Sequence, residues 1–222
     1  MAVEDPRTSD LLARLAHVDP TSLADADPWL RVLPPEIRPV RPGSRLVGRA
    51  VTVDSREDLL PVLLGLRAAG PGDVLVVTGS PGRALAGELF ATEALRRGLA
   101  GLVIDGFCRD SRTLRALELP VFARGVSPRA YGAQHVPEEH DVIQVGEVLI
   151  SPGDLVVADD DGVVVGSPDE IAAAIEGAEA IQRREEALRT AIEGGESLFD
   201  HLNLDEHVQA LRDGRDSRLT FS

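Results

Sequence analysis

The chain has 222 residues, of which 43% are hydrophobic, 27% charged and 3% aromatic. This length suffices for one sizeable core and is too short for two ordinary enzyme domains. Its 37 acidic and 23 basic residues give a formal net charge of -14, which repels phosphate backbones and argues against a nucleic-acid partner. The single cysteine, Cys108, excludes an intrachain disulfide framework and a zinc site built from several thiolates.

The chain also lacks the signals of membrane proteins and secreted proteins. It contains no uninterrupted apolar run of about 18 residues, and its first residues, MAVEDPRTSD, do not join a basic segment to an apolar one. We therefore expect no membrane association, and a reducing cytoplasm is the expected location.

The first 45 residues are rich in proline and charge. The segments DPRTSDLLARL and PTSLADADPWL begin with Asp, Ser and Thr caps, so they predict two short helices. We interpret residues 1–45 as an N-terminal helical cap that covers a sheet edge or contacts a neighbouring subunit.

Strands alternate with helices in the next part of the chain. Alternating apolar residues predict a strand at 45–53, and helical spacing follows in LLPVLLGLRAAG up to Gly70. Apolar runs at 73–79, 100–106 and 120–125 predict three more strands with helices between them. This order is typical of parallel strands joined by right-handed crossovers, with helices on the faces of the sheet.

The pattern changes after about residue 140. Gly, Pro and Asp turns divide DVIQVGEVLISPGDLVVADDDGVVVG into three or four short strands, which predicts antiparallel hairpins. A capping box at residues 167–170 opens a helix of roughly 25 residues, well above the average of about 11 to 12. Part of this helix is expected to pack on another subunit. Residues 46–195 are thus assigned to an α/β core and residues 196–222 to a C-terminal helical tail.

The first candidate for chemistry is the segment from Gly79 to Glu88, between a predicted buried strand and a helix. Such a position leaves free N–H groups and the positive end of the helix dipole at the carboxyl edge of the sheet, where an anion binds. The segment matches no phosphate-binding fingerprint, which favours a small carboxylate. The alternative is a turn made easy by its glycines.

The second candidate is Arg109-Asp110, after another buried strand. Arginine offers a planar fork to a carboxylate, and aspartate binds hard divalent cations. Alternatively, the pair forms a loop salt bridge and caps the helix that begins near Ser111. Twenty residues lie between Glu88 and Arg109, about one helix plus one strand, so both side chains can face the same crevice.

These residues lie in a stretch, GELFATEALRRGLAGLVIDGFCRDSRTLRALELPVFARGVSPR, that resembles the heart of the RraA-like family. The family includes divalent-metal-dependent 4-hydroxy-4-methyl-2-oxoglutarate aldolases and the regulator of ribonuclease activity A. TSLADA, IRPVRPGSRLVGRAVTV and SPGDLVVADDDGVVV extend the resemblance to roughly residues 20 to 195. It implies a swivelling-domain-like α/β/β/α sandwich with a mixed sheet and a long C-terminal helix, assembled as a homotrimer or a dimer of trimers.

The resemblance also implies roles for single residues. Asp110 matches the ligand of Mg²⁺ or Mn²⁺, Arg109 matches the arginine that binds the pyruvyl carboxylate, and Glu88 matches the acid that orders water on the metal. Gly87, Leu89 and Phe90 match the substrate-binding segment, in which the N–H groups of the last two meet the carboxylate or enolate. An acid from the C-terminal helix of a neighbouring subunit completes some family sites, and Glu185 or Glu186 is the candidate here.

The implied chemistry is cleavage of a carbon–carbon bond beside a 2-oxo acid, which leaves a pyruvate enolate that a divalent metal stabilises. The chain contains no lysine, so an aldolase mechanism through a lysine imine is excluded. We therefore expect a metal-dependent aldolase with oxaloacetate decarboxylase activity. Two alternatives stay open: a non-catalytic adaptor that inhibits a protein partner such as a ribonuclease, and an enzyme of a specialised pathway with a different substrate.

Overall fold

The computed structural model describes residues 5–79, 82–136 and 142–221. The chain divides into two compact units, Met1–Ala178 and Glu179–Ser222, and the boundary lies within helix α6 (Pro168–Glu193). The buried side chains of α6, Ile171 to Ala178, all belong to its first part.

The first unit contains the predicted strands and helices and, in addition, the short strands β1, β2 and β5, which the sequence pattern does not indicate. Its strands are β1 (Arg31–Val32), β2 (Arg38–Pro39), β3 (Leu46–Asp54), β4 (Asp73–Thr78), β5 (Ala84–Ala86), β6 (Gly101–Cys108), β7 (Val121–Val126), β8 (Ile143–Val145), β9 (Val148–Ile150), β10 (Leu155–Asp159) and β11 (Gly162–Gly166). Its helices, besides the start of α6, are α1 (Pro6–Leu15), α2 (Pro20–Ala26), α3 (Leu59–Ala68), α4 (Glu88–Arg96) and α5 (Ser111–Ala116).

One mixed sheet of nine strands forms the centre of this unit. Its order is β1-β11-β10-β3-β4-β6-β7-β2, with β5 pairing beside β6. The pairs β3–β4, β4–β6 and β6–β7 are parallel, whereas β10 and β11 form an antiparallel hairpin, as do β8 and β9. The predicted parallel part and the predicted hairpins are both confirmed.

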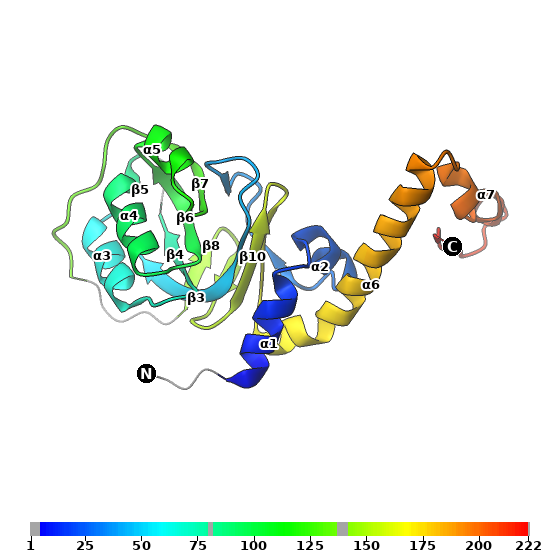
Figure 1. The fold of residues 1–222 in the computed structure, drawn as a ribbon, viewed down its shortest axis with the longest axis horizontal. Helices are drawn as coiled ribbons and strands as arrows, with labels where there is room; N and C mark the ends of the chain where they lie inside the picture. Colours follow the sequence, from blue (N-terminus) through cyan, green and yellow to red (C-terminus); the bar gives the residue numbers. More distant parts are fainter. Residues whose placement is uncertain (1–4, 80–81, 137–141, 222) are drawn as a thin grey trace. The chain divides into compact units, whose positions relative to one another are not determined.

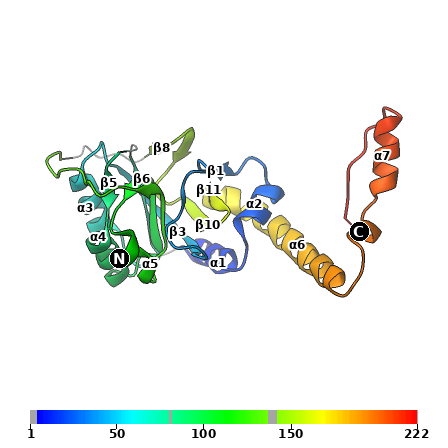
Figure 2. The same ribbon diagram turned by 90° about the horizontal axis from the view of Figure 1, so that it is seen from above.

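The two halves of the sheet pack against each other through side chains that alternate along each strand. In β4, Val74 and Val76 belong to a middle apolar cluster that also includes residues of β10 and β11, whereas Leu75 and Val77 face helices α3 and α4. The outer side chains of β10 pack instead on α1, α2 and α6. The α/β/β/α order of layers follows, and Figures 1 and 2 show α3, α4 and α5 on one side of the strands and α1 and α2 on the other.

The second unit contains the end of α6, a 3-10 turn (Leu198–His201) and α7 (Leu204–Arg212). Its side chains are mostly exposed, and Ala210 is its buried apolar residue. Within the described parts of the chain, no helix combines the length and apolar character that crossing a membrane requires.

Candidate active site

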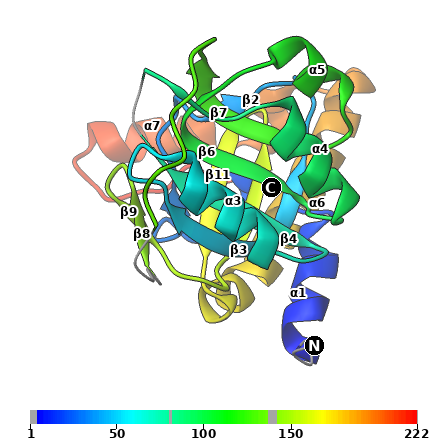
Figure 3. The same ribbon diagram turned by 90° about the vertical axis from the view of Figure 1, so that its left-hand side faces the viewer.

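The two candidate segments of the sequence meet because the short strand β5 pairs with the end of β6. The N–H of Arg109 donates to the carbonyl of Ala86 at 2.9 Å, so the start of α4 lies directly beside Arg109 and Asp110. Helices α3 and α4 cover the strands on this face (Figure 3). The predicted juxtaposition of Glu88 with Arg109 and Asp110 is present. Strand β5 itself was interpreted as part of a loop.

Asp110 has an unusual backbone that aims its carboxylate at helix α4. Its φ of 57° and ψ of 37° lie in the left-handed region, which few non-glycine residues adopt and which is concentrated at functional sites. It occupies the N-cap position of α5, yet its side chain makes no capping hydrogen bond. Its Oδ2 instead accepts a hydrogen bond from the N–H of Glu88 at 3.1 Å. The alternative interpretation as a side-chain cap of this helix is therefore wrong.

Arg109 lies against the same carboxylate. Its Nε is 3.4 Å from Oδ2 of Asp110, and the arginine side chain is 44% exposed. Within the described parts of the chain, its two terminal nitrogens donate no hydrogen bond to protein. They are the ends of the planar fork that binds carboxylates in a bidentate manner. The ion pair that the sequence offered as an alternative thus exists and leaves the fork free.

Gly87 is required for this close approach. A Cβ at this position would lie 2.4 Å from Oδ2 of Asp110 and 2.8 Å from Cγ of Arg109. Both distances are far below normal contact, so any side chain larger than hydrogen displaces one of the two residues. The sequence assigned Gly87 to substrate binding, and its geometric role is to admit the carboxylate to the helix N-terminus.

We expect Gly87→Ala to lower kcat/KM for oxaloacetate decarboxylation by roughly 100-fold, because a displacement of about 1 Å in a catalytic group has that effect. Steady-state kinetics of the purified variant measure this loss. Gly70→Ala is the matched control, since its added Cβ meets only Asp73 at the ordinary distance of 3.8 Å. Equal activity of both variants would show that the contact between Gly87 and Asp110 is irrelevant to the reaction.

Glu88 is exposed, and it is held by a residue that the sequence analysis did not select. The hydroxyl of Thr113 donates to Oε2 of Glu88 at 3.0 Å. Thr113 lies three residues after Asp110, a spacing that brings both to one side at the start of a helix. Once Asp110 is taken as a candidate site residue, this spacing in the sequence indicates Thr113 as a second residue of the site.

The first turn of α4 offers two further donors. The N–H of Glu88 is used by Asp110, but within the described residues the N–H groups of Leu89 and Phe90 have no acceptor, as expected in the first turn of a helix. Gly87 supplies no side-chain cap. An anion beside Arg109 can therefore accept from these N–H groups and benefit from the helix dipole.

A cavity of about 480 Å³ opens in front of these groups. It is lined by Glu88, Arg109, Asp110, Ser111, Arg112, Thr113, Val126, Ser127 and Pro128. The wall after β7 is fixed by Ser127, whose N–H donates to the carbonyl of Cys108 at 2.8 Å and whose hydroxyl donates to the carbonyl of Gly82 at 2.9 Å. The candidate residues thus face one solvent-filled space large enough for a small organic acid.

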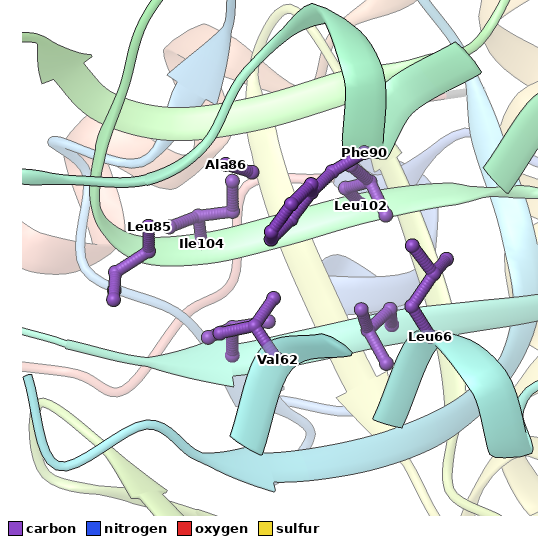
Figure 4. Close-up of a pocket in the computed structure, with 9 residues that line it drawn as sticks. Val62, Leu66, Leu85, Ala86, Phe90, Leu102 and Ile104 are labelled. Atoms are coloured by element: carbon purple, nitrogen blue, oxygen red, sulfur yellow. The ribbon is translucent and has the colours of Figure 1, made fainter. Parts of the chain in front are cut away.

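On its other side Arg109 borders an apolar region. A smaller cavity of about 40 Å³ is lined mainly by apolar side chains, among them Leu89 and Phe90. Behind it, Phe90 projects from α4 between Val62 and Leu66 of α3 and Ile104 of β6, where a void of about 10 Å³ remains (Figure 4). The aromatic ring fixes the start of α4 against the core and thereby its free N–H groups.

Two nearby ionisable groups are structural. Burial raises the pKa of the Cys108 thiol to about 11, so the thiol stays protonated at neutral pH. Burial alone would raise the pKa of Asp58, but its carboxylate accepts from the backbone N–H groups of Gln134, Leu60 and His135, and its pKa is lowered overall. Asp58 thus ties the segment after β7 to the start of α3.

Glu185 and Glu186, the candidates for a completing acid, lie in the second unit and are exposed on α6. Glu186 pairs with Arg189 at 2.7 Å on the same helix.

The donor set suits a divalent cation that keeps several waters. Among the described residues, no group of three or more His, Cys, Asp or Glu side chains is placed to enclose a metal ion. Mg²⁺ usually binds through one or two carboxylates and retains waters. Asp110 fits this requirement, because Oδ2 is fixed by Glu88 and Arg109 while its side chain is 35% exposed at the cavity.

A family model described as RraA-like, Aldolase/RraA, matches residues 21–165. The chain belongs to the RraA-like family. A protein of Halalkalibacterium halodurans with the name "Putative 4-hydroxy-4-methyl-2-oxoglutarate aldolase" is 37% identical over 159 residues, which are 70% of this chain and 76% of that protein.

Solved structures of the family share the fold. RraAS2 of Streptomyces coelicolor, described as an unusual member of the RNase ES inhibitor RraA protein family, has a TM-score of 0.72 at 30% identity and covers 82% of this chain and 98% of its own. The RNA-processing inhibitor RraA from Thermus thermophilis has a TM-score of 0.61 at 31% identity over 67% of this chain and 91% of its own. An aldolase or an RraA-like role is therefore supported.

Proposed function

We propose that this RraA-like protein is a divalent-metal-dependent carbon–carbon lyase that acts on a short 2-oxo acid through a pyruvate enolate. The observation that carries the proposal is the left-handed Asp110, whose carboxylate is held against the N-terminus of α4 beside the free fork of Arg109. The relative from Halalkalibacterium halodurans, whose name describes an aldolase for a 2-oxo acid, supports it.

Arg109 binds the carboxylate next to the keto group in this proposal. Among the described residues its terminal nitrogens have no hydrogen-bond acceptor, and its Nε is engaged with Asp110, so the fork is oriented before the substrate arrives. The N–H groups of Leu89 and Phe90 donate to the same end of the substrate, where negative charge increases as the enolate forms.

The reaction breaks the bond between C3 and the leaving carbon, and its electron pair becomes the enolate of pyruvate. In an aldol substrate the hydroxyl on the leaving carbon gives its proton to water held by Glu88 as its carbonyl forms. Asp110 would hold a divalent cation, which would supply Lewis-acid stabilisation of that negative charge. Glu88, oriented by Thr113, orders water at the cavity wall, and a proton delivered to C3 from this water completes pyruvate. In oxaloacetate the leaving carbon departs as carbon dioxide, so decarboxylation tests the enolate step alone.

The test is oxaloacetate decarboxylation by the purified protein, with Mg²⁺ or Mn²⁺ and again after treatment with a chelator. We expect turnover well above the metal-catalysed background, loss of that turnover on chelation and recovery when the metal is restored. Turnover no faster than that of the metal alone would contradict the proposal and favour the adaptor role, which binding assays with a ribonuclease would then examine.

A further inference from the structure

Arg112 is a second guanidinium on the wall of the same cavity. It lies in the first turn of α5, is exposed, and lines the cavity together with Arg109. Within the described parts of the chain, it has no acidic partner. Its position adds nothing to the stability of α5, because the N-terminal turn of a helix favours negative side chains.

The formal charges around the cavity indicate how many negative charges a ligand needs to neutralise it. Glu88 and Asp110 contribute two negative charges, and Arg109 and Arg112 contribute two positive ones. These charges cancel, so a divalent cation at Asp110 leaves a surplus of two positive charges. A substrate with two carboxylates neutralises this surplus, whereas a substrate with one carboxylate leaves part of it unmatched.

The other side chains of the wall carry no positive charge, so they are less suited to a second anion. The hydroxyls of Thr113 and Ser127 already donate to Glu88 and to the carbonyl of Gly82. Glu88 and Asp110 repel an anion. Arg112 is therefore the cationic group of the cavity that Arg109 and the proposed metal leave available.

We propose that Arg112 is a specificity-determining residue that binds a second carboxylate, remote from the keto group, and so makes the site selective for dicarboxylic 2-oxo acids. The inference rests on the proposed function, since it assigns the first carboxylate to Arg109. The carboxylate in question lies beyond the bond that breaks, so loss of the Arg112 side chain affects binding of that carboxylate rather than formation of the enolate. Oxaloacetate, whose second carboxylate itself leaves as carbon dioxide, is outside this inference.

The test uses two ligands of equal chain length, 2-oxoglutarate and 2-oxopentanoate, which differ by a terminal carboxylate in place of a methyl group. Calorimetry with the full chain and saturating Mg²⁺ measures the dissociation constant of each. We expect the unaltered protein to bind 2-oxoglutarate about 5- to 10-fold more tightly than 2-oxopentanoate. One charge-assisted contact in a partly exposed site provides a gain of this size. Arg112→Ala should abolish this preference without weakening the binding of 2-oxopentanoate.

Arg115→Ala is the matched control, because it removes the same charge from the same helix at a residue outside the cavity wall. It should retain the preference. Loss of the preference in both variants, an unchanged preference in Arg112→Ala, or no binding of either ligand would each overturn the inference. Oxaloacetate turnover by the unaltered protein, measured separately, shows whether the proposed function itself has failed.

Discussion

Replacing Asp110 with asparagine should reduce kcat/KM for metal-dependent oxaloacetate decarboxylation by at least about 100-fold, because the change removes the charge of the only proposed protein ligand to the metal. Asparagine tolerates the left-handed backbone of this position and keeps an oxygen that can accept from the N–H of Glu88. We therefore expect little change in the thermal unfolding midpoint. Alanine is a less informative substitution, since a left-handed alanine adds about 1–2 kcal/mol of strain.

Kinetics and a direct measurement of Mn²⁺ binding by electron paramagnetic resonance distinguish catalysis from folding. Asp169→Asn is the matched control, because it removes the same charge from an exposed carboxylate whose partner is Arg7. The control should keep normal turnover and Mn²⁺ affinity. Normal turnover and Mn²⁺ affinity in Asp110→Asn would show that the metal ligand lies elsewhere.

The covering of the sheet on both faces could be predicted, because strands that are buried on both faces are apolar at every position. The run from Val74 to Val77 is apolar at every position, which requires cover on both faces, and the structure provides it with helices on one face and the second half of the sheet on the other. Strand β5 carried no comparable signal. Its three residues, Ala84, Leu85 and Ala86, are too few to show an alternating pattern, and only tertiary pairing with β6 makes them a strand.

The proximity of Glu88, Arg109 and Asp110 in the candidate site could be predicted from the sequence, whereas its geometry and the contact of Thr113 with Glu88 could not. Polar residues at the carboxyl ends of parallel strands meet at one edge, so the spacing of Glu88 and Arg109 indicated a common crevice. The left-handed backbone of Asp110 has no such signature, because the sequence at an N-cap is equally compatible with ordinary capping. The tertiary hydrogen bond from Glu88 decides between the two conformations.

Changing Arg109 to lysine should lower kcat/KM for oxaloacetate by roughly 10- to 100-fold, although the charge is kept. Lysine has no planar fork, so it loses one charge-assisted hydrogen bond, which is worth about 1.5 to 3 kcal/mol. Arg96→Lys is the matched control: its guanidinium pairs with Glu93 on the exposed surface of α4, and this change should leave the kinetics unaltered.

Arg109→Ala should lower kcat/KM more than Arg109→Lys does, and part of the additional loss should appear as a higher KM. The reason is that the fork binds the carboxylate both in the ground state and when the enolate has formed, whereas a contact made only in the transition state changes kcat alone. Loss of the guanidinium also removes the partner of Asp110 at 3.4 Å, so metal affinity should be measured in the same variant. If Arg109→Lys and Arg109→Ala both keep normal kcat/KM on every 2-oxo acid tested, the pyruvyl site is wrongly placed and the adaptor role becomes the better account of Arg109.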